Sequence, residues 1–364
     1  MQVKIPSEAV GAKIVEWYSC LVSRSYDQAM LLRDETKTMI RQMEKNDKIL
    51  AYFSLVDYRH SMLMNSYDKN TLDEELLEEH EEITQIDNML KYFYYFISGQ
   101  SEYVHERYRS AVKLFERAGR LLEHVNDEAE EAEFYQYTGY VYYRLNQYLI
   151  ASSYMEKASV IYQRLQYTEP YLNCQIILAA IYQELHNPDK GEVLLKEALE
   201  KARGKGKLSA VIIRVLGLNK LSVKDYLSAE LYFKEALTYE EHKDALIGAK
   251  TSYNLSNALF NQGKKDEALR YFQIAEAEMT YYQNKEYLAR CLATKGLHIK
   301  NDYQLVDKAI ERLTKLGLDF EIAEVAEDAS GYAEKEGNDS LALKYMKVAH
   351  RARLYQNAIG EDSK

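Results

Sequence analysis

A charged run changes into an apolar, helix-like pattern within residues 43–60, which read MEKNDKILAYFSLVDYRH. Asp47 stands at the change, directly after Asn46 and before KILAYF. Its carboxylate could carry chemistry, because Asp is one of the common acid-base groups of enzymes. Asn46 or Asp47 would equally serve as the N-cap of the helix that follows. The residues of this stretch leave both interpretations open.

Other signatures of catalysis are scarce in the sequence. His80 in HEEIT and His105 in HERYR each lack a second histidine four residues later, so the zinc-protease pattern is absent. No Cys-x-x-Cys pair exists to begin a metal site. The glycine- and lysine-containing RGKGKL at 203–208 lacks the phosphate-loop spacing and a preceding strand. We therefore predict no metal site and no cofactor.

The composition indicates helices throughout. Hydrophobic residues make up 47% of the chain and charged residues 29%, which is the balance of a globular protein. Only 3 prolines and 15 glycines punctuate 364 residues, too few for the turns of a sheet protein. The 33 tyrosines suit half-buried seams between packed helices, because the ring is apolar and its tip is polar.

The net charge excludes one class of partner. At −10, the field of the protein repels a phosphate backbone, so we expect no direct nucleic-acid partner and a preference for cationic peptides or basic protein surfaces. Three widely spaced cysteines suit reduced thiols better than a disulfide framework. No apolar stretch is long enough to span a bilayer, and the N-terminus lacks a secretory stretch. These features predict a cytoplasmic protein without a membrane partner.

A repeat of 38 to 40 residues organises most of the chain. Its pattern is a small residue, a large apolar residue four positions later, and alanine three positions after that. The occurrences are Ala111/Phe115/Ala118, Ala151/Met155/Ala158, Gly191/Leu195/Ala198, Ala229/Phe233/Ala236, Ala268/Phe272/Ala275 and Ala342/Met346/Ala349. A second small residue precedes each by twelve positions, at Gly99, Gly139, Ala179, Gly217, Ser256 and Ser330. This pattern is typical of tetratricopeptide hairpins, in which two antiparallel helices meet at small residues.

The repeat degrades between residues 280 and 320, where Ala309, Leu313 and Leu316 could be its remnant. We expect packing roles for the repeated Ala, Gly and Phe positions. Stacked hairpins wind into a superhelix whose concave inner surface holds peptides or partner helices. Lys, Arg, Asn and Asp residues on the inner helices are therefore the better candidates for ligand contact.

The first eighty residues do not follow the repeat. Val10–Val22, Tyr26–Met43 and Ile49–Ser66 each show the apolar spacing of an amphipathic helix. The predicted fold is thus all-α, with an N-terminal three-helix bundle followed by a right-handed tetratricopeptide superhelix of about six to seven hairpins. We assign residues 1–66 to a target-binding bundle, 67–83 to an acidic linker, 84–358 to the repeat domain with a peptide or partner groove, and 359–364 to a tail.

This organisation resembles the Rap family of Gram-positive bacilli over essentially the whole chain. The residues that carry the resemblance are EWYSCLVS at 16–23, QMEKNDKILAYFSLVDYRHSML at 42–63, MLKYFYYFISGQSEY at 89–103 and EEAEFYQYTGYVYYRLNQYLIASSY at 130–154. The resemblance implies a regulator that acts on a response regulator. Some members hydrolyse the aspartyl phosphate of a receiver domain, and others block a DNA-binding domain. It further implies that secreted and re-imported Phr peptides bind the repeat groove and pull the bundle from its target.

Asp47 departs from the family pattern. In the phosphatase members the matching residue is a glutamine whose amide positions a water for attack on the phosphoryl group. An ionised Asp47 cannot donate a hydrogen bond, and like charges at about 4 Å cost about 1 to 4 kcal/mol. That cost predicts a loss of roughly tenfold to a thousandfold in rate. Asn46 is the alternative amide if the alignment shifts by one residue.

Other positions of the resemblance are kept or changed. Leu50 and Tyr58 match bundle positions that face a receiver domain, and either could equally be core. In the repeat domain, Val215 and Leu218 replace asparagines that hold the peptide backbone in relatives. The next hairpin contains SYNLSN, which places Asn254 and Asn257 one repeat later. The sequence therefore predicts an altered peptide response or none.

Three functions remain open at this stage. The favoured hypothesis is a Rap-like regulator that sequesters a response regulator or a related transcription factor, in sporulation, competence or mobile-element control, without enzymatic activity. The alternative is a response-regulator aspartate phosphatase that uses Asn46 or Asp47. The third is a tetratricopeptide scaffold without a role in signalling.

Overall fold

The computed structural model of the chain describes residues 4–64, 88–125 and 127–357. Within these ranges every regular element is helical, and a single bridge between Ile5 and Met43 is the only β-type pairing. The fold is all-α, as the composition predicts. The chain divides into two compact units, Met1–Leu178 and Ala179–Lys364. The acidic linker predicted at 67–83 and the tail at 359–364 lie outside the described residues.

The helices of the first unit are α1 (Ser7–Val22), α2 (Tyr26–Gln42), α3 (Asp47–Met64), α5 (Asn88–Val104), α6 (Tyr108–Gly119), the short 3-10 helix η2 (Leu122–His124), α7 (Glu128–Arg144), α8 (Tyr148–Arg164) and the beginning of α9 (Thr168–Glu184). The second unit holds the end of α9, then α10 (Pro188–Lys201), α11 (Gly206–Ser222), α12 (Tyr226–Ala236), α13 (Glu240–Lys243), α14 (Leu246–Asn261), α15 (Lys265–Tyr281), α16 (Lys285–Thr294), the π-helix η3 (Lys295–Lys300), α17 (Tyr303–Lys315), α18 (Asp319–Lys335) and α19 (Asp339–Asn357).

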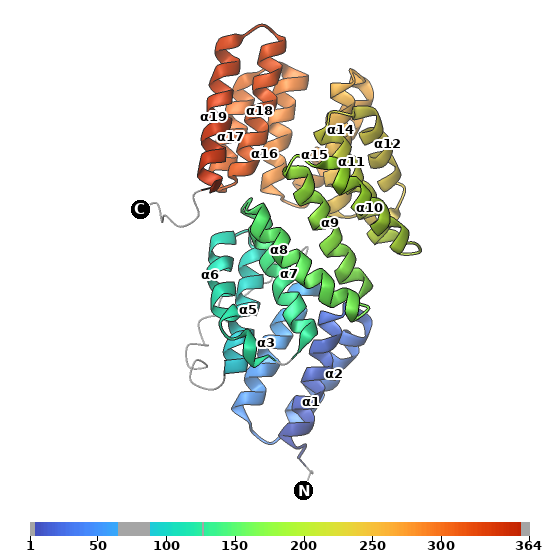
Figure 1. Cartoon of the computed structure of the whole chain (residues 1–364), viewed down its shortest axis with the longest axis vertical. Helices are drawn as coiled ribbons and strands as arrows, with labels where there is room; N and C mark the ends of the chain where they lie inside the picture. The colour runs from blue at the N-terminus through green and yellow to red at the C-terminus, as the bar shows by residue number, and fades with distance from the viewer. Residues whose placement is uncertain (1–3, 65–87, 126, 358–364) are drawn as a thin grey trace. The chain divides into compact units, whose positions relative to one another are not determined.

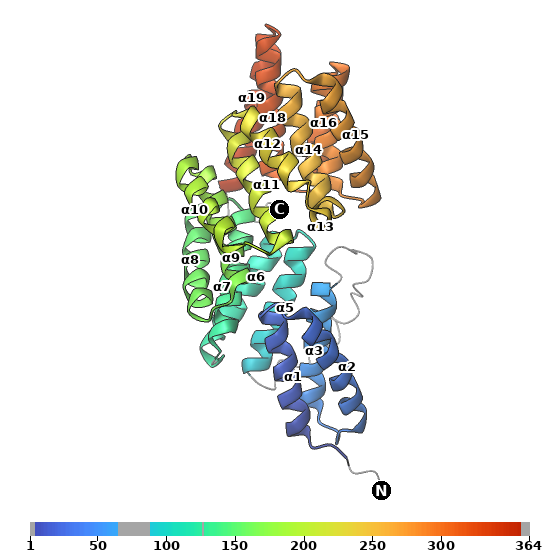
Figure 2. The same cartoon turned by 90° about the vertical axis from the view of Figure 1, so that its right-hand side faces the viewer.

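Helices α1, α2 and α3 lie side by side at the N-terminal end of the first unit (Figure 2). Val10, Ile14, Trp17 and Leu21 recur at helical spacing along α1 and are almost completely buried. This stripe forms one core with residues of α3, α5 and α7. The bundle is therefore packed onto the first hairpins, and its core continues into theirs.

The hairpins form where small and large residues face each other, as the repeat predicts. A Cβ atom added to Gly99 would lie 2.4 Å from the Phe115 ring, and one added to Gly217 would lie 2.6 Å from the Phe233 ring. Only glycine therefore fits where α5 meets α6 and where α11 meets α12. Helices α5/α6, α7/α8, α11/α12, α14/α15, α16/α17 and α18/α19 pair in this way, and the α9/α10 pair spans the boundary between the units. The described residues thus hold seven hairpins (Figure 1).

The degraded repeat is a complete hairpin in the structure. Ala309 and Leu313 on α17 are fully buried, and Leu316 is half-buried at the helix end. Helix α16 continues into η3, whose last residue is followed by Asn301 in the left-handed conformation. The wider π-turn interrupts the regular helix and explains why the sequence repeat weakens there.

Met346 holds the large-residue position of the last repeat but does not fill the core. Its side chain is 52% exposed, and Tyr345 is the fully buried residue of that turn. The Tyr345 hydroxyl donates to the Tyr303 carbonyl at 3.2 Å and to Asp307 Oδ1 at 3.0 Å. The Tyr345 ring, whose polar tip contacts α17, takes the buried place at this turn, and Ala349 of the repeat remains buried.

No helix within the described ranges is both long and apolar enough to cross a bilayer. The same residues contain no group of three or more His, Cys, Asp or Glu side chains arranged to hold a metal ion.

Candidate functional site

Helix α3 begins with an amide cap. Asn46 Oδ1 accepts a hydrogen bond from the Ile49 backbone N–H at 3.2 Å, and the Asn46 carbonyl accepts from Leu50 N–H at 3.0 Å. Asn46 is thus the residue that caps the helix, which is one of the two interpretations of the sequence. The same contact holds the amide oxygen of Asn46 against the helix end.

Asp47 is the first residue of α3, and its side chain is 77% exposed. Its carboxylate lies 3.6 Å from the Lys45 ammonium and stands at the helix N-terminus, where negative charge is favoured. Asp47 is therefore a solvated surface carboxylate. Its ionised oxygens cannot donate a hydrogen bond to a phosphoryl group.

Leu50 and Tyr58 lie further along the same helix, and both are half-buried against the core of the first unit. The Tyr58 hydroxyl is 2.8 Å from Ser101 Oγ of α5, and burial raises the pKa of Tyr58. Asp47 and Tyr58 are eleven positions apart, about 16 Å along the helix axis. The structure thus spreads the predicted partner-binding residues over about three turns of α3 and does not gather them at one point.

The four segments that carry the family resemblance meet in one buried polar network. Tyr18 donates to Glu130 Oε2 at 2.6 Å, and Tyr92 donates to Glu130 Oε1 at 2.9 Å. Arg59 forms a hydrogen-bonded ion pair with Glu133, and its guanidinium lies 4.4 Å from the Tyr18 ring centroid. We call Tyr18, Arg59, Tyr92, Glu130 and Glu133 the buried network. Helices α1, α3, α5 and α7 each contribute to it, so these segments join the bundle to the first hairpins.

Burial controls the ionisation of this network. Desolvation raises the pKa of Glu130 to about 7, although the charge of Arg59 works against the rise. Next to the network, Trp17 Nε1 donates to His60 Nδ1 at 3.0 Å, which requires an unprotonated Nδ1. Burial, with the charge of Arg33, lowers the pKa of His60 to about 4. His60 is therefore a neutral acceptor at physiological pH.

In the second unit, the substituted family positions are part of the packing. Val215 is buried, and Leu218 packs against a core cluster that includes Phe233 and Leu255. Neither side chain can make a polar contact with a peptide. The two asparagines of the next inner helix, α14, differ from each other. Asn257 Oδ1 accepts from Thr294 Oγ1 at 3.3 Å, whereas Asn254 Nδ2 is buried without a hydrogen-bond partner among the described residues.

Charged groups surround Tyr287 on the neighbouring inner helices. Arg290 donates to Glu286 at 3.1 Å and to Glu324 at 2.7 Å. Burial raises the pKa of Tyr287, and the nearby cations Arg214 and Arg290 oppose that rise. Arg214 is itself buried, with its Nε unpartnered within the described part of the chain. Helices α11, α14, α16 and α18 thus offer cations, carboxylates and an amide donor within one unit. We call Arg214, Asn254, Asn257, Arg290 and Glu324 the inner polar cluster.

Sequence reasoning missed the buried network and both arginines of the inner polar cluster. Arg59 pairs with Glu133, 74 positions away, so no local pattern could reveal that contact. Arg214 did leave a signal, because it interrupts the apolar run AVIIRVLGL at 210–218. A charge in the middle of a buried helix needs a partner or a ligand.

Together these features define an all-helical tetratricopeptide-repeat protein with an N-terminal bundle packed onto its first hairpins and a polar cluster on its later inner helices. A family profile described as response regulator aspartate phosphatase H, N terminal, matches residues 4–65, and a tetratricopeptide repeat profile matches residues 249–273. The chain belongs to the Rap family.

Individual relatives agree with this placement. Response regulator aspartate phosphatase I of Bacillus subtilis (strain 168) is 27% identical over 361 residues, covering 96% of this chain and 92% of the relative. A crystal structure of a Rap protein complexed with competence and sporulation factor superposes with a TM-score of 0.90 at 24% identity, over 96% of this chain and 99% of that one. At this identity the superposition shows the shared fold.

One further relative carries a different name. Type II methyltransferase M.CeqI of Rhodococcus hoagii is 36% identical over 365 residues, which cover 99% of this chain and 70% of that protein. The methyltransferase activity in this name is that of the relative. The residues described here form helices without a sheet, and the remaining part of the relative has no counterpart in the match.

Proposed function

We propose that this Rap protein binds a response regulator or a related transcription factor through its N-terminal bundle and inhibits it by sequestration, without hydrolysing an aspartyl phosphate. The cytoplasm, where the sequence places the chain, is the compartment proposed for this interaction. The family supports the class of target, since the curated relative from Bacillus subtilis is named for response regulators. Sporulation, competence and mobile-element control are the processes proposed for the target.

The observation that carries the non-enzymatic part is Asp47. An exposed carboxylate occupies the position at which the phosphatase members have a glutamine, and it stands at the start of α3. A carboxylate accepts hydrogen bonds but donates none when ionised, so it can neither orient a water through an N–H nor approach a phosphoryl group without repulsion. Leu50 and Tyr58 remain as apolar and aromatic contacts for a target on the same helix.

Gel-shift assays and a phosphatase assay test the proposal together. Candidate response regulators of the host are mixed with the protein, and their binding to target DNA is measured. In parallel, phosphorylated receiver domains are followed for loss of label. We expect inhibited DNA binding of at least one regulator and no accelerated loss of label. The variant Asp47→Gln should create hydrolysis of the phosphorylated receiver. The matched variant Glu44→Gln, three residues before α3, should not.

The second candidate function is an aspartate phosphatase that uses Asn46. The matched family profile, which is named for an aspartate phosphatase, favours it, and Asn46 supplies an amide one residue before Asp47. Its oxygen is engaged in the helix cap. Rapid loss of label with the unaltered protein, abolished by Asn46→Ala and retained in Asp47→Ala, would favour this function and reject sequestration as the sole mechanism.

We also propose that the inner polar cluster receives a signalling peptide whose contacts differ from those of relatives with asparagines at 215 and 218. Asn254 and Arg214 each hold a buried donor without a partner among the described residues, and a peptide backbone or side chain could accept from both. Val215 and Leu218 provide apolar contact only. Absence of peptide control is the alternative.

Titration calorimetry with synthetic peptides tests this point. The peptides tile the C-terminal part of any short secreted precursor that sequencing finds next to the gene. We expect one of them to bind and Asn254→Ala to weaken it about tenfold, as expected for one lost hydrogen bond at a buried site. Asn261→Ala, an exposed position on the same helix, should leave the affinity unchanged. Failure of every peptide to bind would favour the alternative.

A further inference from the structure

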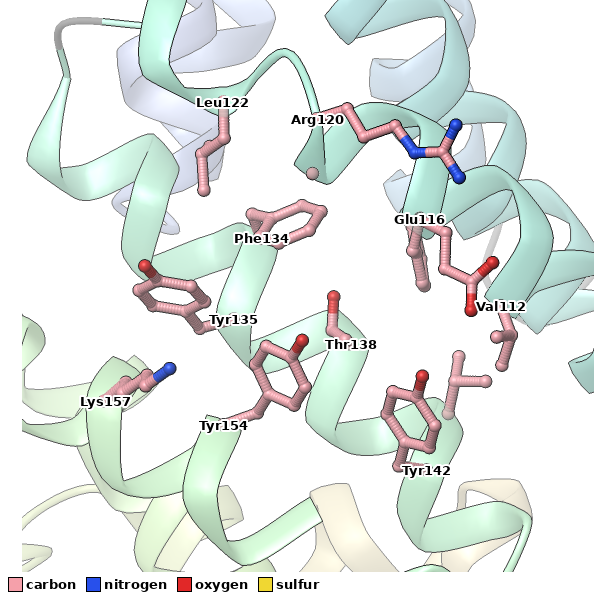
Figure 3. A pocket seen from close by; sticks show the side chains of 13 residues that line it. Val112, Glu116, Arg120, Leu122, Phe134, Tyr135, Thr138, Tyr142, Tyr154 and Lys157 are labelled. Atoms are coloured by element: carbon pink, nitrogen blue, oxygen red, sulfur yellow. The ribbon is translucent and has the colours of Figure 1, made fainter. Parts of the chain in front are cut away.

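A cavity of about 540 Å³ opens in the first unit between α6, α7 and α8. Five of its thirteen lining residues are aromatic, and Phe134, Tyr142 and Tyr154 are among them (Figure 3). This volume lies within the range of sites that hold small organic molecules, and aromatic walls with a few polar groups are typical of such sites. Neither the proposed target surface on α3 nor the inner polar cluster includes any of these residues.

The floor of the cavity holds a buried hydroxyl without a partner. Thr138 is 4% exposed, and its Oγ1 forms no hydrogen bond among the described residues. In Figure 3 the hydroxyl of Thr138 points from α7 into the cavity. Leaving a buried hydroxyl unsatisfied is costly, so its orientation suggests that something in the cavity completes it.

Other threonines of this chain form a hydrogen bond within their helix that Thr138 lacks. A threonine within a helix ordinarily donates to the carbonyl four residues earlier. Five do so here at 2.6 to 3.0 Å, namely Thr36, Thr38, Thr251, Thr280 and Thr314. Thr138 lies in the middle of α7 and does not form this bond. The Thr138 hydroxyl therefore faces the cavity and forms no hydrogen bond to a carbonyl of its own helix.

A cation stands at one end of the cavity. The Lys157 ammonium lies 5.3 Å from the Tyr135 ring centroid and 5.4 Å from that of Tyr154, and it makes no ion pair with the described residues. Two ring faces hold the charge in place without neutralising it. In Figure 3 Lys157 reaches toward the cavity from α8. Glu116 and Arg120 line the opposite side and contribute one charge of each sign.

We propose that this cavity binds a small organic anion with a flat aromatic body. The ring of the ligand packs against Phe134, Tyr142 and Tyr154, because aromatic groups pair favourably in offset or edge-on contact. Its acid group lies at the Lys157 end, where a positive charge has no carboxylate partner. Thr138 donates its hydroxyl proton to the ligand at the cavity floor. A carboxylate and a phosphate would both satisfy this arrangement.

The fluorescent dye 8-anilino-1-naphthalenesulfonate tests the proposal, because it combines flat rings with an anion. The full chain is titrated, and dye fluorescence gives the dissociation constant. We expect Lys157→Gln to weaken binding about tenfold and Thr138→Val to weaken it several-fold, as expected for a charged and a neutral hydrogen bond. Thr138→Val should not lower the unfolding temperature, since the hydroxyl has no protein partner to lose. Lys347→Gln, which removes an exposed mid-helix charge on α19, is the matched control and should bind as the unaltered protein does.

The charge requirement is tested with ligands of equal shape. The neutral dye N-phenyl-1-naphthylamine should bind the unaltered protein and Lys157→Gln alike. Displacement of the anionic dye by 1-naphthylacetate supports a carboxylate ligand, and displacement by 1-naphthyl phosphate supports a phosphate ligand. The proposal is overturned if the neutral 1-naphthaleneethanol displaces the dye as well as either acid, or if Lys157→Gln and Thr138→Val bind it as tightly as Lys347→Gln.

Discussion

The two units differ in how their buried charged groups are paired. In the first unit Arg59, Glu130 and Glu133 are at most 1% exposed and find their partners in one another, across helices that are far apart in the sequence. In the second unit Asn254 and Arg214 keep buried donors without a partner, and the carboxylates around Arg290 include the half-exposed Glu324. Ion pairs of Arg59 thus join distant helices in the first unit, although Arg59 Nε and Nη1 and Glu133 Oε1 form no hydrogen bond among the described residues. In the second unit the unpartnered donors of Arg214 and Asn254 lie in the inner polar cluster. Substitutions at matched positions of the two units test this difference.

The largest expected effect is the loss of Arg59. Arg59→Met leaves two carboxylates buried without their cation, and breaking a buried pair in this way costs about 3 to 5 kcal/mol. Urea unfolding, monitored by the fluorescence of the single tryptophan, Trp17, measures the loss of unfolding free energy in the bundle. Arg33→Met is the control, because Arg33 pairs with Asp57 where both side chains are 27% exposed. Such a pair contributes about 1 kcal/mol or less.

If Arg59→Met loses no more stability than Arg33→Met, the first unit does not depend on its buried network. A triple variant, Arg59→Met with Glu130→Gln and Glu133→Gln, gives an independent check. It should recover part of the lost free energy of unfolding, because no buried charge is then left alone.

The next effect is a pH dependence located at His60. Its pKa is lowered from 6.5 to about 4 in the folded protein, so the unfolded chain takes up a proton first as the pH falls. The stabilisation is complete above pH 6.5 and is lost as the pH falls toward about 4. The shift of the His60 pKa corresponds to a change of about 3 kcal/mol at most in the free energy of unfolding. Glu130 works in the opposite direction, since its pKa is raised to about 7.

His60→Asn separates the two contributions, because an asparagine oxygen can accept from Trp17 Nε1 but does not titrate. We expect the free energy of unfolding of the unaltered protein to fall more steeply between pH 6.5 and 4.5 than that of His60→Asn. His350→Asn, at an exposed position, should follow the unaltered curve. Parallel curves for His60→Asn and the unaltered protein would show that His60 does not cause the pH dependence of stability.

A smaller effect compares two buried asparagines of the second unit. Asn219 Nδ2 donates to the Pro188 carbonyl at 2.9 Å, whereas Asn254 Nδ2 has no partner within the described residues. Asn219→Leu should destabilise the ligand-free protein by about 1 kcal/mol, because it removes a hydrogen bond that joins α11 to the start of α10. Asn254→Leu should leave the stability unchanged or raise it, since an unsatisfied donor is removed. Thermal unfolding of both variants without peptide measures the difference, and equal losses would show that Asn254 is a structural residue.

The contrast also shows what the sequence could reveal. The hairpins were predictable because Gly99 and Phe115, like Gly217 and Phe233, recur at fixed spacing and meet within one hairpin. The cap of α3 was predictable to within one residue, because capping depends on local residue types. Met346 holds the large-residue position of the last repeat, yet Tyr345 is the buried residue, because sequence spacing does not show which of two adjacent large residues faces the core. The network of Arg59 and Glu133 and the orientation of Thr138 depend on contacts between distant helices.

The smallest effect concerns the turns between helices. Gln166 follows α8 with a φ of 60°, and Gly263 follows α14 with a φ of 76°; both are exposed. The next backbone N–H closes the turn in each case, from Tyr167 to the Tyr162 carbonyl at 2.9 Å and from Lys264 to the Leu259 carbonyl at 3.0 Å. A side chain in this left-handed region costs about 1 kcal/mol or more, which glycine avoids at the expense of a more flexible unfolded chain. Gln166→Gly should therefore stabilise the first unit by about 0.5 kcal/mol, and Gly263→Gln should destabilise the second by a similar amount. Paired urea titrations of the two variants measure both changes, and a loss of stability in Gln166→Gly would mean that the side chain makes contacts that outweigh its backbone strain.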